Sequence, residues 1–262
     1  MFRWTAIGKF KMALTIKKII DPSFYARLPG IIKYRLIRLY HEKLLFKVLP
    51  KESVFTSIWR NNYWGDAESL SGPGSTLIQT EELRKKAPIM FEEFEIKSVF
   101  DAPCGDLNWM QDILEHTNLK YVGGDIVNDI VEQNIANYKK ENVDFLQFDI
   151  TSDSFPDADV WLCRAVLYHL SNADILAALE RFTESNIKYI LTTNRITNSE
   201  HINKDIATGD YRDLNLMLPP FNFPKDVLWE IDDYVYPHPP MTISLWTRKQ
   251  ILDVLPHIQE NL

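Results

Sequence analysis

The sequence predicts an α/β fold: a seven-stranded, mostly parallel sheet with a final antiparallel strand, helices on both faces, and an N-terminal helical extension. Two observations predict the sheet. Short apolar runs alternate with helical patterns between residues 97 and 193, as expected for parallel strands joined by helices. Two more strand patterns then follow, separated only by Pro237-His238-Pro239-Pro240, and so short a connection favours antiparallel pairing.

Each element is placed by an apolar run or a helical period bounded by turn-forming residues. A leading helix is expected over Thr76–Phe94, although Pro88 can interrupt it. The first strand contains Val99–Phe100, and a helix opens after the turn that follows it. The later strands are expected at Leu119–Asp125, Val143–Asp149, Ala158–Arg164, Ile187–Thr193, Val227–Tyr236 and Met241–Thr247, and the later helices at Asn128–Lys140, at Asn172–Thr183 and from Lys249.

Charge divides the chain into a basic arm and an acidic body. Residues 1–51 hold 12 Lys and Arg against two acids, whereas the remaining residues hold 17 basic and 34 acidic side chains. An acidic body argues against a nucleic-acid partner. The two cysteines cannot form a disulfide framework, and the chain shows neither a signal peptide nor an apolar run of transmembrane length. We therefore expect a cytoplasmic protein.

Residues 1–54 are predicted to form the basic helical extension, ahead of a main domain at 55–262. The arm interleaves aromatic and aliphatic residues with Lys and Arg. One interpretation is a contact with the inner face of a membrane or with a lipid-linked substrate. The other is a helical extension that packs on the acidic body and complements its charge.

A segment rich in aromatic residues precedes the first strand. Residues 55–75 place Trp59, Tyr63 and Trp64 around Arg60 and two asparagines. Aromatic rings with polar groups among them suit a lid over a small ligand. The alternative is an aromatic corner that only covers the sheet edge. We interpret residues 55–96 as a lid and a leading helix.

The central motif is Lys97–Met110, KSVFDAPCGDLNWM, in which a strand ends on Asp101 and turns through Gly105 into a helix. Glycine lets backbone approach a ligand closely. The second and third strands also end on acids, Asp125 and Asp149. Because parallel strands present their carboxyl ends at one sheet edge, three strand-end acids are expected around one ligand. Each acid alone is as well explained by a helix cap or a solvated turn.

These motifs, with Cys163–Leu170 (CRAVLYHL) after the fourth strand, resemble class I methyltransferases that depend on S-adenosylmethionine (SAM). The resemblance covers about 55–247 and implies a Rossmann-like sheet. The family pattern Asp/Glu-x-Gly-x-Gly-x-Gly keeps only Gly105 here, with Pro103 and Leu107 at the other glycine positions. Because these two glycines are missing, the sequence does not determine how the backbone runs around the carboxypropyl group of SAM.

The resemblance implies a SAM site at the strand ends. Asp101 and Gly105 would line its methionine end, Asp125 would bind the ribose hydroxyls, and Asp149 would accept from the adenine amine. The expected cofactor residues are Trp64, Asp101, Pro103, Gly105, Asp106, Asn108, Trp109, Asp125, Ile126, Asp149, Ile150 and Arg164.

Methyl transfer from a sulfonium needs alignment and water exclusion, and a hydroxyl acceptor also needs a base. His169 is the expected base; alternatively it is a structural histidine beside the cofactor. The polar, proline-rich segment 197–225 is expected to be a functional loop. Tyr168, Arg195, Arg212 and Asn215 are expected to contact a small-molecule or saccharide acceptor, an anionic one included, because guanidinium groups bind anions. Loop salt bridges would explain the arginines equally.

Two other functions remain open from the sequence. One is a non-catalytic SAM-binding or membrane-peripheral scaffold. The other is a nicotinamide-dependent oxidoreductase, which the missing G-x-G-x-x-G pattern and the final strand pair disfavour. No Cys, His and Asp spacing indicates a metal site.

Overall fold

The computed structural model describes residues 46–198 and 200–262. Seven strands form one sheet in the order β3-β2-β1-β4-β5-β7-β6. The strands are β1 (Ser98–Asp101), β2 (Lys120–Asp125), β3 (Val143–Gln147), β4 (Val160–Cys163), β5 (Tyr189–Arg195), β6 (Trp229–Asp232) and β7 (Met241–Thr247). Only β7 runs against the others, since it pairs antiparallel with both β5 and β6. The predicted fold class is confirmed.

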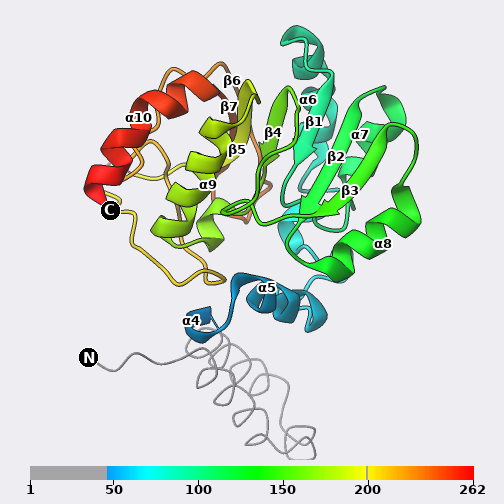
Figure 1. Cartoon of the computed structure of the whole chain (residues 1–262), viewed down its shortest axis with the longest axis horizontal. Helices are drawn as coiled ribbons and strands as arrows, with labels where there is room; N and C mark the ends of the chain where they lie inside the picture. The colour runs from blue at the N-terminus through cyan, green and yellow to red at the C-terminus, as the bar shows by residue number, and fades with distance from the viewer. Residues whose placement is uncertain (1–45, 199) are drawn as a thin grey trace, which may run out of the picture.

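Helices cover both faces of the sheet (Figure 1). One face packs against α6 (Glu81–Glu93), α7 (Met110–His116) and α8 (Asn128–Tyr138), and the other against α9 (Asn172–Glu184) and α10 (Arg248–Asn261). All four residues of β4 are buried, as expected for a central strand with helices on both sides. Burial of these two apolar layers is the main term that stabilises the fold.

Local sequence sets where the helices begin. Thr247 accepts a hydrogen bond from the backbone of Gln250, whose side chain accepts one from the backbone of Thr247, and this capping box starts α10. Ser171 caps α9 by accepting from the N–H of Asp174. The leading helix α6 begins at Glu81, five residues later than predicted, and runs through Pro88 to Glu93.

Two short helices precede the sheet, α4 (Phe46–Val48) and α5 (Lys51–Arg60). Figure 1 shows them beside one edge of the sheet rather than on either face. Helix α5 crosses the predicted boundary at residues 54 and 55, so the first six residues of the predicted lid are helical. Most of the predicted basic extension, and with it the predicted membrane contact, lies outside the described residues. No helix within 46–262, residue 199 aside, has the length and apolar character needed to cross a membrane.

Candidate functional site

The turn after β1 lies directly against the end of β2. Gly105 adopts a φ of +58°, a conformation that favours glycine, and its N–H donates to Oδ2 of Asp125 at 3.1 Å. A Cβ at Gly105 would lie 2.3 Å from Oγ of Ser71 in the lid segment. The turn is therefore tightly packed between β2 and the lid, and both observations favour glycine there.

The two acids at the ends of β1 and β2 are buried, and their pKa values are raised. Burial raises the pKa of Asp101 to about 7, opposed by a 2.7 Å hydrogen bond from the Tyr121 hydroxyl and reinforced by nearby Asp125. Burial raises the pKa of Asp125 to about 6, opposed by hydrogen bonds from the N–H groups of Val127 and Gly105. Buried carboxylates side by side favour a positively charged ligand.

The acid after β3 has a different environment. β3 ends at Gln147, two residues before the predicted end at Asp149. Beyond Gln147 one backbone hydrogen bond joins it to β2, from the Phe148 N–H to the Asp125 carbonyl at 2.9 Å. Asp149 then accepts from the N–H and hydroxyl of Thr151, and Nζ of Lys51 lies 3.4 Å from its Oδ2. Asp149 is thus already paired with a cation from α5.

Arg164 follows β4 and is fixed by two contacts. Its Nε and Nη2 each donate a 2.9 Å hydrogen bond to the buried carboxylate of Asp233, and its guanidinium lies 5.3 Å from the ring centroid of Trp109. The next residue, Ala165, has a φ of +59°, which is unfavourable for a residue with a side chain. The chain is therefore held in a strained turn at the point where β4 reaches the site.

His169 is partly buried and neutral. Its Nδ1 lies 2.8 Å from the Asp210 carbonyl; because a carbonyl only accepts, Nδ1 carries the proton and Nε2 keeps a lone pair. Burial lowers the pKa of His169 to about 4. The ring lies 5.3 Å from that of Trp64, between centroids.

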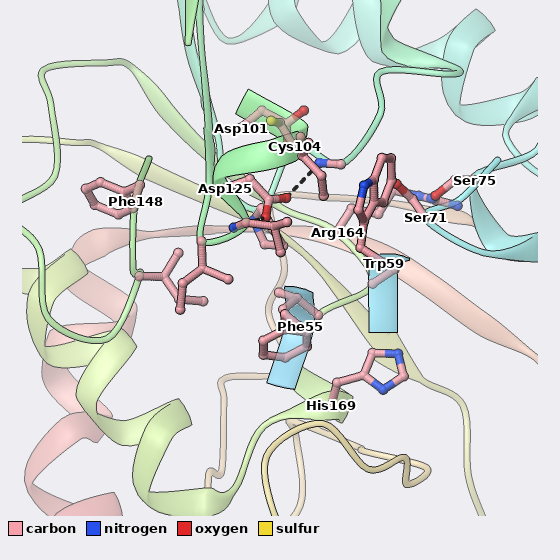
Figure 2. Close-up of a pocket in the computed structure, with 18 of the residues that line it drawn as sticks. Phe55, Trp59, Ser71, Ser75, Asp101, Cys104, Asp125, Phe148, Arg164 and His169 are labelled. Carbon is pink, nitrogen blue, oxygen red and sulfur yellow. Dashed lines mark hydrogen bonds between the residues drawn. The ribbon is translucent and has the colours of Figure 1, made fainter. Parts of the chain in front are cut away.

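These residues line one cavity. Figure 2 shows part of its lining, with the Asp125 hydrogen bond drawn as a dashed line. Eleven residues predicted for the site line it: Trp64, Asp101, Pro103, Gly105, Trp109, Asp125, Ile126, Asp149, Ile150, Arg164 and His169. The sequence analysis did not identify the contribution of α5, whose Lys51, Phe55 and Trp59 also line the cavity. Their four-residue spacing places them on one helix face, which is the signal that could have identified them.

Two residues predicted to contact cofactor bind the lid segment instead of lining the cavity. The Asp106 carboxylate accepts from the Ser69 hydroxyl at 3.0 Å and from the Leu70 N–H at 2.9 Å. Asn108 donates to Oε1 of Glu68 at 2.7 Å and to the carbonyl of Ser75 at 3.0 Å. They hold the lid segment against the turn, while Ser71 and Ser75 of that segment reach the cavity.

The four residues predicted to contact the acceptor lie outside the cavity lining. Arg212 is buried and donates to the carbonyls of Lys204 and Leu170. The Asn215 side chain donates to the Thr197 hydroxyl and accepts from the Met217 N–H, and its backbone pairs with the side-chain amide of Asn203. Arg195 donates to the Pro239 carbonyl at 2.7 Å and to the Tyr211 hydroxyl, and it lies over the ring of Tyr168. These contacts order the loop behind His169.

Within the described part of the chain, no three His, Cys, Asp or Glu side chains are grouped as a metal site requires. Cys104 and Cys163 are free and buried, and burial raises the pKa of both thiols well above the usual value. Neither cysteine has the lowered pKa of a reactive thiol.

Residues 99–185 match the sequence model of a family described as a methyltransferase domain. The fold resembles that of human N-acetylserotonin methyltransferase, solved in complex with SAM, with a TM-score of 0.53 and 13% identity; the alignment covers 80% of this chain and 64% of that one. Magnesium protoporphyrin IX methyltransferase from Synechocystis, solved with bound SAH, gives a TM-score of 0.49 and 11% identity, over 82% of this chain and 99% of that one. No curated protein matches the sequence. Residues 99–185 thus match a methyltransferase-domain family, and the strand order and the fold agree with those of solved methyltransferases.

Proposed function

We propose that the protein transfers the methyl group of SAM to an oxygen atom of a small-molecule acceptor by in-line displacement. The observation that carries the proposal is the state of His169. It lines the same cavity as Gly105 and Asp125, and its Nδ1–H is committed to a carbonyl. Nε2 therefore holds a lone pair that can take a proton from an acceptor hydroxyl.

The residues around the cavity fit SAM chemically. Each oxygen of Asp125 accepts one backbone hydrogen bond, which leaves lone pairs for the two ribose hydroxyls. The apolar side chains of Phe148 and Ile150 line the cavity beside Asp149 and would pack on the adenine ring. Asp101 would bind the ammonium group at the amino-acid end. When bound, SAM supplies a methyl group on a good leaving group, so the protein must align the acceptor and exclude water.

His169 suits the role of base because it is neutral throughout the physiological pH range. A pKa of about 4 makes it a weak base in the free protein, but it also keeps the lone pair available at pH 7. Trp64 packs on the ring, and Phe55 lines the same cavity, so both would exclude water from the acceptor oxygen. Desolvation of this kind strengthens the hydrogen bond between the acceptor hydroxyl and Nε2.

For the acceptor, we propose an uncharged compound with hydroxyl groups, such as a saccharide. The walls near His169 are apolar or aromatic, from Phe55, Trp64, Val166 and Leu170, and aromatic walls with few polar groups bind rings that carry hydroxyls. Arg195 and Arg212 already donate to carbonyl groups, which makes them poor partners for an anionic acceptor.

The test measures SAH formation, corrected for SAM hydrolysis, against panels of saccharides, phenols, amines and carboxylic acids. His169→Gln should lower kcat for a hydroxyl acceptor by about a hundredfold or more, the usual effect of losing a general base, and should leave SAM affinity unchanged. The exposed His116→Gln is the matched control. Equal activity of both variants would overturn the role of His169. Transfer only to nitrogen or to carboxylates would overturn the proposed acceptor, and binding of SAM without transfer to any acceptor would favour the scaffold alternative.

A further inference from the structure

The ion pair between Arg164 and Asp233 joins two distant parts of the chain at the edge of the cavity. Arg164 follows β4, a central strand, whereas Asp233 follows β6 at the edge of the sheet. Because β6 runs parallel to β4, both residues lie at the carboxyl edge, where the cavity opens. Both side chains are buried, with 4% and 1% of their surfaces exposed. Arg164 also lines the cavity, but Asp233 does not.

Asp233 fixes one edge of the Arg164 guanidinium and leaves the rest free. Arginine has five N–H donors, of which Asp233 accepts one from Nε and one from Nη2. Among the described residues, no acceptor for Nη1 is present. Trp109 covers a face of the group at 5.3 Å from the ring centroid. The remaining donors of a rigidly held cation thus lie at the cavity wall, an arrangement that suits a carboxylate.

The other cation that lines the cavity is already neutralised. Lys51 lies 3.4 Å from Asp149 and 3.2 Å from Asp174, at the end where the adenine would bind. Asp101, which would bind the ammonium group of the cofactor, lies close enough to Arg164 for the guanidinium to lower its pKa. Among the described residues that line the cavity, Arg164 is therefore the cation that keeps unused donors at the amino-acid end.

We propose that Asp233 is a positioning residue: it holds Arg164 so that the unused guanidinium donors bind the carboxylate of SAM. The inference rests on the proposed function, since it assumes that SAM occupies this cavity. It assigns a role to the segment that follows β6, which lies outside the matched family region of 99–185. Without Asp233 the guanidinium would keep its charge but lose its fixed orientation.

The test compares two ligands by calorimetric titration of the full chain. SAH has the amino-acid carboxylate, whereas 5′-methylthioadenosine lacks the whole amino-acid end. Asp233→Asn should weaken SAH binding about tenfold or more, the effect of a lost charge-assisted hydrogen bond, and change methylthioadenosine binding by less than about twofold. Arg164→Lys should give the same pattern, since lysine keeps the charge but not the fork of donors. Asp253→Asn, at an exposed ion pair with Lys249, is the control and should affect neither ligand.

A second variant covers the case in which Asp233→Asn fails to fold. The double variant Arg164→Met with Asp233→Leu removes the ion pair without leaving a buried charge unpaired. This double variant should also bind SAH more weakly and bind methylthioadenosine as before. Equal losses for both ligands would show a purely structural role, and unchanged SAH binding would show no role; either result overturns the inference. If the unaltered protein binds neither ligand, the proposed function itself fails.

Discussion

The N–H of Gly105 donates a 3.1 Å hydrogen bond to the carboxylate of Asp125, twenty residues further along the chain. One carboxylate therefore both fixes the turn after β1 and faces the space where a ribose would bind. Asp125→Asn keeps the size of the side chain but removes the charge and one acceptor, so SAM binding should weaken by about 1.5–3 kcal/mol. Isothermal titration measures this. Asp144→Asn, at an exposed pair with Lys139, should bind SAM normally; equal affinities of the two variants would contradict the role of Asp125.

Gly105→Ala should destabilise the protein for two reasons. The left-handed φ of +58° costs about 1–2 kcal/mol for a residue with a Cβ, and the new methyl group would lie 2.3 Å from Ser71 Oγ. The free energy of unfolding, from urea titration, should therefore fall. Adding Ser71→Ala removes the contacting oxygen and should restore part of the loss. Gly74→Ala, with open space around it, serves as the control. A Gly105→Ala protein as stable as the parent would show that the turn rearranges freely.

SAM affinity should rise with pH. Asp101 and Asp125 have pKa values of about 7 and about 6, so lowering the pH protonates both in the free protein. SAM carries a net positive charge and favours the ionised carboxylates, so binding releases protons and tightens as pH increases from about 5 to 8. Arg164 faces Asp101 and opposes the rise of its pKa. Titration in buffers of different ionisation enthalpy measures the proton release; a flat affinity profile would refute the linkage.

Helix α5 should control how fast the cofactor leaves. Lys51 ties the start of the helix to Asp149 and Asp174, and Arg60 ties its end to Asp129 at 2.6 Å. Lys51→Met removes the first attachment, worth about 0–1 kcal/mol for a partly exposed pair. SAH dissociation in stopped flow and amide exchange within α5 should both become faster. Lys249→Met, in an exposed pair on α10, is the control, and unchanged rates in the Lys51 variant would indicate that α5 does not cover the site.

The strand ends could be predicted from the sequence because their signals are local. An apolar run, an acid and a turn lie within ten residues of each other at Asp101, at Asp125 and near Asp149. Parallel strands then bring those ends to one edge without any further information. The antiparallel β7 was also predictable, although β6 ends at Asp232 rather than at Tyr236 and its connection to β7 is longer than predicted.

The sequence assigns the loop arginines to substrate binding because it does not show which carbonyl groups will accept their hydrogen bonds. Arg212 donates to Leu170, 42 residues away, and Arg195 to Pro239, 44 residues away. Such pairs depend on the path that the chain takes over the sheet edge after β5. That path produces no periodic pattern in the sequence. The face of α5 did leave one, at Lys51, Phe55 and Trp59, but a helical period alone does not distinguish a cavity wall from a core contact.

The cavity has two sides of different origin. The floor, from Asp101 to Leu170, lies within the matched family region of 99–185, whereas Phe55, Trp59 and Trp64 lie before it. The strand-end part of the cavity and the segment that covers it are thus encoded in separate stretches of sequence. If the proposed function holds, randomising Phe55 and Trp64 while keeping Lys51 and Ser71, which contact the strand-end side, should change acceptor selectivity more than SAM affinity.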